Sequence, residues 1–351
     1  VVLYGAKAAK GAILITTKRG KVDGLRIDAS VNTGWYVAKA LPEYRGSAEY
    51  MTLYNEALWN DNYGANPRYS ATDIYNHASG INPARYTDIN YYSSDYIRKA
   101  YNRTEATVEV QGGAKRAHFY ANVNYYNYGD LRKYGGWDGA YTDRFSVRGN
   151  VDVIINNFIT GYANASATFY NGRSGKGNLW DAAATVRPNY PQGASPLIST
   201  DLIDPNATAA WDLIKNTQNL IDGKYFLGGT QETMSNVLAD GYAAGTSQFV
   251  SRQFQFDAGV NFDLGAVTKG LSFKTMFSVD YAKSYNLSYE NQYAIYVPTW
   301  SNYNGKDVIV GLTKLGDEVH SGVQNSSNTS DRQTITWNGH FDYERTFGGV
   351  P

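Results

Sequence analysis

Residues 25–37 read LRIDASVNTGWYV, and apolar and polar side chains alternate along them. Every odd-numbered position from Leu25 to Val37 is apolar except Thr33, whereas the even-numbered positions hold Arg, Asp, Ser, Asn, Gly and Tyr. Successive side chains of a β-strand point to opposite faces of a sheet. The stretch is therefore predicted to be a strand with one apolar and one polar face.

The same alternation recurs seven times further along the chain. The stretches concerned are 105–111, 117–125, 144–153, 159–169, 253–263, 271–281 and 334–344. Most of the eight candidate strands contain 9 or more residues. A tilted strand needs about 9–11 residues to cross a bilayer, whereas strands of soluble proteins are typically about 5–6 residues long. The lengths therefore favour a transmembrane antiparallel β-barrel over a soluble sandwich.

Short and long connections alternate between the candidate strands. The short ones are 112–115, 154–157 and 264–270, and the long ones are 38–103, 127–142, 171–248 and 291–330. Bacterial outer-membrane barrels have tight periplasmic turns and longer extracellular loops. Nothing in the fold of a soluble sandwich requires every long loop to lie at the same end. The long connections are accordingly expected to be extracellular.

Composition agrees with a β-rich membrane protein. The 351 residues include 31 Tyr and 35 Gly, and no Cys, which excludes disulfides and thiol chemistry. Lys plus Arg and Asp plus Glu are both 32, so no net charge attracts nucleic acid. No run of 18 apolar residues is present, and the mean hydropathy is −0.46. Barrel strands average out as polar because lipid-facing and lumen-facing residues alternate.

Aromatic residues gather near the ends of the candidate strands. The pairs Trp35–Tyr36, Tyr125–Tyr126 and Phe169–Tyr170 fall at outer ends, and Phe262, Phe273, Tyr343 and Phe347 at inner ends. Aromatic girdles at both membrane interfaces are expected of such barrels. A general enrichment of strands in aromatic residues is the alternative explanation.

Residues 1–21, VVLYGAKAAKGAILITTKRGK, precede the first candidate strand. A turn, a β-branched run and a basic end follow one another here, and the stretch resembles the last part of the plug domain of SusC/RagA-type TonB-dependent transporters. That family has a "YG…AANG" turn followed by "VILITTKKGK"; Lys10 stands where it usually has Asn. The resemblance implies that the plug motif consists of Tyr4, Gly5, Gly11, Thr16, Thr17 and Lys18.

The resemblance continues into the candidate strands. Residues 107–113 with 119–121 are similar to "LSVSGG…YYASLGY", and 143–152 to "RYSLRLNLD". Residues 341–348 resemble a "Y.RTFG" turn, and 81–92 resemble the first external loop. The family's barrel has about 22 strands and is filled by its plug. The resemblance thus implies that 1–24 is the C-terminal end of a plug and 25–351 the N-terminal part of a barrel, so that the chain is an internal fragment.

The resemblance also implies a function. It predicts TonB-dependent import of a glycan oligomer or peptide across the bacterial outer membrane, with a SusD-like lipoprotein as a lid. TonB would bind a segment outside this chain. A non-transporting SusC-like scaffold subunit is the first alternative, and a small barrel or a soluble glycan-binding β module ranks below it.

No catalytic pattern accompanies these features. The four His residues are dispersed without metal-ligand spacing, and 172–177 lacks the full spacing of a phosphate-binding loop. We therefore expect no enzyme, no cofactor and no metal.

The long connections carry the candidate ligand residues. Four aromatic residues of 171–248 suit stacking on sugar rings or peptide side chains, although packing within the loop core explains the same residues and is the favoured explanation: Trp180, Tyr190, Trp211 and Tyr225. Residues 47–60 are predicted to form a short helix capped by Ser47, with Met51, Tyr54 and Leu58 on one face.

Overall fold

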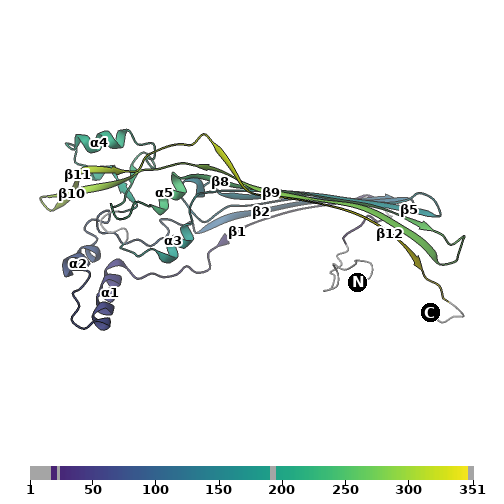
Figure 1. Ribbon diagram of the computed structural model, residues 1–351, viewed down its shortest axis with the longest axis horizontal. Coiled ribbons are helices and arrows are strands. Elements are labelled where there is room, and N and C mark those ends of the chain that lie inside the picture. The colour runs from purple at the N-terminus through teal and green to yellow at the C-terminus, as the bar shows by residue number, and fades with distance from the viewer. Residues whose placement is uncertain (1–16, 22–23, 190–194, 347–351) are drawn as a thin grey trace.

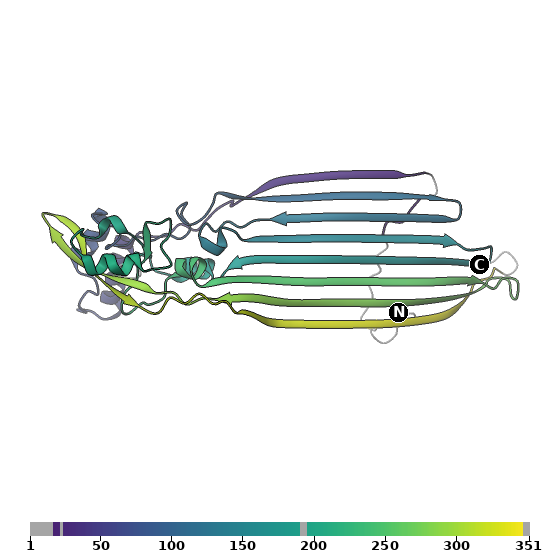
Figure 2. The same ribbon diagram turned by 90° about the horizontal axis from the view of Figure 1, so that it is seen from above.

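The computed structural model describes residues 17–21, 24–189 and 195–346. Eight long antiparallel strands form one sheet, in the order β1-β2-β3-β4-β5-β8-β9-β12 (Figure 2). The strands are β1 (Arg26–Val37), β2 (Ala100–Ala114), β3 (Ala117–Tyr128), β4 (Tyr141–Ile154), β5 (Ile159–Gly175), β8 (Gly245–Asp263), β9 (Leu271–Glu290) and β12 (Gln324–Tyr343). The eight predicted strands are confirmed, and all but β1 extend beyond the alternating stretches at the end that carries the long connections.

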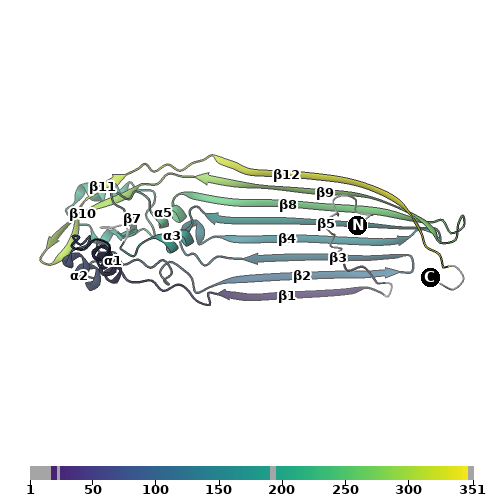
Figure 3. The ribbon, with the colours of Figure 1, turned by 60° about the horizontal axis from the view of Figure 1, so that its bottom comes forward.

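The segments between the strands lie at opposite ends of the sheet (Figures 1 and 3). Tight turns join β2 to β3, β4 to β5 and β8 to β9 at one end. At the other end the long connections form a cap. Its elements are α1 (Ser47–Asp61), α2 (Ala71–Ser79), α3 (Leu179–Thr185), α4 (Thr208–Lys215), α5 (Val237–Tyr242), the strands β6 (Leu197–Ser199), β7 (Tyr225–Leu227), β10 (Ile295–Tyr303) and β11 (Lys306–Leu315), and the 3-10 turns at Gly135–Trp137 and Thr200–Leu202.

The register of the sheet brings the apolar residues of all eight strands onto one face. One row of directly paired residues runs Ile27, Val110, Ala121, Gly149, Ala165, Phe256, Val279 and Ile335. The next row runs Asp28, Glu109, Asn122, Arg148, Ser166, Gln255, Asp280 and Thr334. The two rows point to opposite faces. We call these the apolar face and the polar face of the sheet.

The apolar face is open. Val31 is 75% exposed, Ile335 61% and Trp337 72%. An uncovered apolar surface that crosses eight strands is far larger than the patches that soluble monomers tolerate. The face therefore requires an apolar environment. Among the described residues, no helix is long and apolar enough to cross a membrane.

Both edges of the sheet are open as well. Within the described residues, β1 pairs only with β2, and β12 pairs only with β9. The eight strands therefore do not close on themselves, which argues against a small self-contained barrel.

The cap has its own hydrophobic interior. Ile198, Ile214, Phe226 and Ile309 form one buried cluster, and two further clusters centre on Trp137 and on Ile295. Trp137 is fully buried and joins the cap to the sheet. A Cβ atom at Gly175, the last residue of β5, would lie 3.0 Å from the Trp137 ring, and one at Gly241 of α5 would lie 2.4 Å from it. Both glycines thus leave room for the indole.

The predicted helix of residues 47–60 is confirmed as α1, but its predicted cap is wrong. Gly46 is the N-cap residue and makes no side-chain cap bond. The carboxylate of Asp88 caps the helix instead, because its Oδ1 accepts the Ser47 N–H at 2.8 Å. The Ser47 hydroxyl donates to the carbonyl oxygen of Thr87 at 2.6 Å. The capping carboxylate comes from 41 residues away, so the local sequence does not reveal it.

The aromatic pairs at the outer strand ends divide between the two faces. Tyr125 and Phe169 lie on the apolar face, where they are paired across the sheet with Phe145. Tyr126 and Tyr170 lie on the polar face, on either side of Arg144. Only one member of each of these two pairs can therefore belong to an outward girdle, because adjacent strand residues point in opposite directions.

An arginine on the apolar face should be costly, while one on the polar face should not. Val123 lies mid-strand on the apolar face of β3, and its neighbour Asn122 lies on the polar face beside Glu109. We expect Val123→Arg to destabilise the folded sheet in lipid by about 2–4 kcal/mol. The matched change Asn122→Arg should cost far less. Urea unfolding in phospholipid vesicles measures both, and equal losses would contradict the assignment of the faces.

Candidate functional site

The described residues at the start of the chain lie against the polar face of the sheet. The Lys18 Nζ is 2.8 Å from Oε2 of Glu109 on β2, and the Arg19 guanidinium is 2.8 Å from Oδ1 of Asp152 on β4. The Asn150 side chain donates to the Lys18 carbonyl oxygen at 3.0 Å. Residues 17–21 thus cross several strands on the face opposite the apolar one.

Gly20 allows this segment to lie directly on the sheet backbone. A Cβ atom at Gly20 would lie 2.4 Å from the carbonyl oxygen of Phe119 on β3, which is closer than real Cβ atoms approach other atoms. Any side chain at this position would push the segment away from β3. The two ion pairs are partly exposed, and exposed ion pairs contribute little to stability. The position of the segment therefore depends also on the backbone packing at Gly20 and on the hydrogen bond from Asn150.

The plug-motif residues of the sequence prediction are only partly described. Thr17 and Lys18 lie in the segment on the polar face. Tyr4, Gly5, Gly11 and Thr16 lie outside the described residues. The acidic partners Glu109 and Asp152 were not predicted, although their position on the polar faces of candidate strands was a usable signal.

The three described aromatic candidates of the 171–248 connection do not come together. Trp180 packs on the cluster around Trp137 and stacks on Tyr92 with ring centroids 6.3 Å apart. Trp211 packs on the α4 cluster and donates from Nε1 to the carbonyl oxygen of Asp204 at 3.1 Å. Tyr225 packs on the cluster around Ile295. Tyr190 lies outside the described residues.

Tyr225 borders a cavity of about 480 Å³ in the cap. Four separate segments build this cavity, and its walls are mostly apolar, formed by residues such as Pro83, Leu197 and Leu202. Two charged residues of β11, Lys306 and Asp307, lie at its wall. The cavity can hold an apolar group next to a fixed carboxylate.

Distant segments hold the Asp307 carboxylate in place. It accepts hydrogen bonds from Asn302 at 2.9 Å, Asn82 at 3.3 Å and Arg85 at 3.4 Å. Burial by itself raises the pKa of Asp307, but the two amides and the Arg85 charge outweigh burial, so its pKa lies below the ordinary range. The carboxylate therefore stays ionised, and it ties the segment after α2 to the β10–β11 hairpin.

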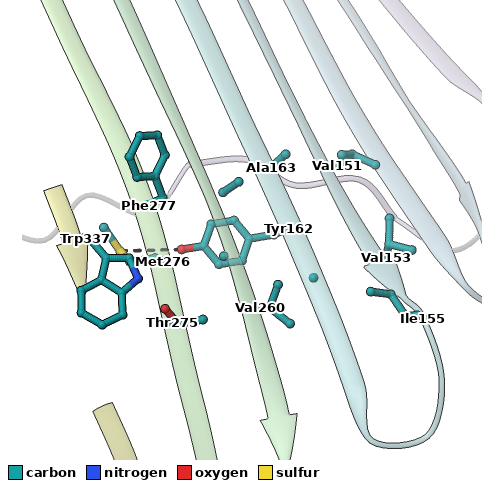
Figure 4. Close-up of a pocket in the computed structure, with 13 residues that line it drawn as sticks. Val151, Val153, Ile155, Tyr162, Ala163, Val260, Thr275, Met276, Phe277 and Trp337 are labelled. Atoms are coloured by element: carbon teal, nitrogen blue, oxygen red, sulfur yellow. Dashed lines mark hydrogen bonds between the residues drawn. The ribbon is translucent and has the colours of Figure 1, made fainter. Parts of the chain in front are cut away.

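Another hollow, of about 530 Å³, lies on the apolar face (Figure 4). Small residues on neighbouring strands leave the space, and Ile155, Phe277 and Trp337 are among the larger side chains around it. Its lining contains no charged residue. The hollow suits hydrocarbon, and it lies on the opposite side of the sheet from residues 17–21.

No cluster that could hold a metal ion is found in the part of the chain that the structure describes. Residues 17–21 lie on the polar face, the cap lies at one end of the sheet, and the opposite face carries the apolar rows.

Known proteins resemble this chain in sequence and in fold. No protein-family model matches it. Over 237 residues it is 21% identical to the TonB-dependent receptor P26 of Formosa agariphila. The matched region is 65% of this chain and 22% of that receptor.

The fold matches solved structures of RagAB. The "closed-closed" and "open-open" states of the RagAB peptide importer give TM-scores of 0.53 and 0.56, and a RagAB peptide transporter structure gives 0.57. The resemblance to RagA-type transporters is confirmed. These matches cover 97% of this chain but only 42–43% of the solved chains, at 14–15% identity. The chain therefore spans about a fifth of the curated relative and under half of the solved ones, whose names are those of a receptor, an importer and a transporter.

A side chain at Gly20 should detach the N-terminal segment from the sheet. We expect Gly20→Val to expose the basic residues Lys18 and Arg19, because the added Cβ atom cannot occupy the space next to Phe119. Trypsin should then cleave after these residues several-fold faster. Gly34→Val is the matched control, since a Cβ atom there meets nothing within 4 Å. Equal cleavage rates in both variants would contradict the packing of this segment.

Loss of the Asp307 charge should weaken the cap. The lowered pKa means that this carboxylate stabilises the fold fully above its unfolded pKa, near pH 4, and loses that contribution as pH falls through its folded pKa. Asp307→Asn should cost about 1–2 kcal/mol at pH 7 and flatten the stability profile below pH 4. Thermal unfolding from pH 2.5 to 7 tests this. Asp201→Asn, at an exposed ion pair with Lys224, should change little; an unchanged Asp307→Asn profile would refute the assignment.

Proposed function

We propose that this chain contains the end of a plug domain (residues 1–24) and the first part of the barrel (residues 25–351) of a TonB-dependent importer in the bacterial outer membrane. One observation carries the proposal: a basic segment lies on the polar face of an eight-stranded sheet whose other face carries apolar residues on all eight strands. A membrane barrel has its plug on the lumen side and lipid on the other side.

The open edges support a larger barrel. β1 and β12 present unpaired backbone groups at the two edges of the described sheet, and such edges do not persist in a membrane. Further strands would complete the pairing. This chain covers only 43% of the RagAB chain that it matches, which agrees with this interpretation.

The cap is the proposed meeting place with a SusD-like surface lipoprotein. The helices α1 and α2 and the turn after α1 expose large apolar side chains, namely Leu53, Trp59, Tyr63 and Tyr75. Aromatic residues are enriched in protein interfaces. The RagAB structures bear the name of a peptide importer, and for this chain a peptide or a glycan oligomer is the proposed cargo. TonB would act through a segment outside residues 1–351.

Removal of residues 1–21 tests the plug assignment. The lumen should lose part of its obstruction, so the full-length protein lacking these residues should show a higher ion conductance in planar bilayers. Gly34→Val serves as the control with an intact plug. Unchanged conductance would remove residues 1–21 from the plug role.

The energy source separates an importer from a non-transporting scaffold. For an importer, deletion of TonB should abolish uptake while leaving surface abundance unchanged, and an affinity-tagged protein should co-purify with one lipoprotein. TonB-independent behaviour together with stable non-lipoprotein partners would favour the scaffold.

A further inference from the structure

A band of aromatic side chains crosses the polar face close to the cap. It consists of Tyr36 on β1, Tyr101 on β2, Tyr126 and Tyr128 on β3, Tyr170 on β5 and Phe249 on β8. The register assigns each of them to the polar face. We call this set the inward aromatic band. Rings on the polar face do not belong to a lipid-facing aromatic girdle.

The rings follow one another at contact distance. Tyr36 and Tyr101 stack with centroids 5.2 Å apart and planes inclined by 22°, and Tyr101 is 6.3 Å from Tyr128. Beyond β4, the Tyr170 ring is 5.6 Å from that of Phe249. Neighbouring strands are spaced about 4.8 Å apart. The band thus offers ring surfaces on five of six adjacent strands, with β4 as the strand that carries no ring of the band.

Two guanidinium groups accompany the rings. Arg103 lies 5.0 Å and Arg144 5.3 Å from the centroid of the Tyr126 ring. Arg103 also pairs with Glu105 at 2.9 Å, whereas Arg144 donates to the Asn124 side chain at 3.4 Å. Among the described residues, Arg144 has no carboxylate partner. Its donors are available to a hydroxyl or acidic oxygen above the band.

A hollow of about 340 Å³ interrupts the band at β4 and β5. Tyr128, Tyr170 and Phe249 line it, together with Thr142 and Gly172. Arg132 also borders it, held by Asp130 at 2.6 Å and by Ser174 at 2.9 Å. The hollow therefore combines aromatic walls with hydroxyl and guanidinium donors.

We propose that the inward aromatic band is a binding track for an oligosaccharide at the entrance of the lumen. Pyranose rings present flat C–H faces to aromatic rings and hydroxyl groups at their edges, and the band supplies both kinds of partner. A sugar chain repeats at a step close to the strand spacing. This inference rests on the proposed function, since it requires the polar face to line a lumen.

The band suits a sugar chain better than a peptide. A bound peptide needs partners for its backbone N–H and C=O groups, and the sheet backbone at the band is already paired strand to strand. The carboxylates near the band, Glu105 and Asp130, already hold arginines and are not free for a peptide amine.

Neighbouring residues on the two faces provide matched variants. Tyr126→Ala, Tyr128→Ala and Tyr170→Ala remove inward rings, and Tyr125→Ala and Phe169→Ala remove outward rings from the same strands. The test uses the full-length protein in detergent. Native mass spectrometry screens it against hexaoses of β-glucan, α-glucan, xylan, mannan and polygalacturonate, and against pooled neutral, acidic and basic hexapeptides. Calorimetry then measures the dissociation constant of each bound probe.

The proposal expects at least one hexaose to bind, with roughly tenfold weaker binding in Tyr128→Ala and Tyr170→Ala and no change in the outward variants. Binding of peptides alone, no hexaose binding, or hexaose binding that the inward variants leave unchanged would each overturn it. Binding in detergent requires neither TonB nor an energy source. A failure of the proposed function would appear in the conductance and uptake measurements instead, so the two can be told apart.

Discussion

The alignment of eight strands in one register is the constraint on which the rest of the structure depends. On the apolar face, apolar residues of neighbouring strands pair directly across the whole width of the sheet, as in the row from Ile27 to Ile335. A slip of one residue at any strand pair would turn every side chain of the displaced strands to the wrong face. Because one face is apolar and the other carries charges, such a slip would expose apolar groups to the lumen side and charges to the lipid side. The register is therefore strongly determined.

That alignment creates the polar surface on which the N-terminal segment and the inward aromatic band lie. The polar face receives residues 17–21 through Glu109, Asp152 and Asn150, which come from two strands far apart in the chain. The same face carries the inward aromatic band nearer the cap. The cap is a separate packing unit, joined to the sheet where Trp137 fits against Gly175. Residues 17–21, the inward aromatic band and the cap therefore occupy successive levels along the sheet.

Much of this architecture follows from local pattern. A period of two identifies each strand from its own residues, and the length of the alternating stretches separates a membrane strand from a soluble one. The plug-like sequence of residues 1–21 carries its own signature. The cap was harder to predict, because its contacts join distant segments. Asp88 caps α1, and Asp307 ties Asn82 and Arg85 to the β10–β11 hairpin. Neither contact leaves a periodic trace in the sequence.

The sequence by itself determined the eight strands, their two unlike faces and the alternation of tight turns with long connections, because these depend on neighbouring residues and on side-chain polarity. Only the tertiary structure decided which residues meet. It separated Trp180, Trp211 and Tyr225 into three different clusters, and it assembled Tyr36, Tyr101, Tyr128 and Tyr170 from four strands into one band. The reason is physical: the direction of a strand residue is a local property, whereas proximity across strands arises from register and pairing between segments far apart in the chain.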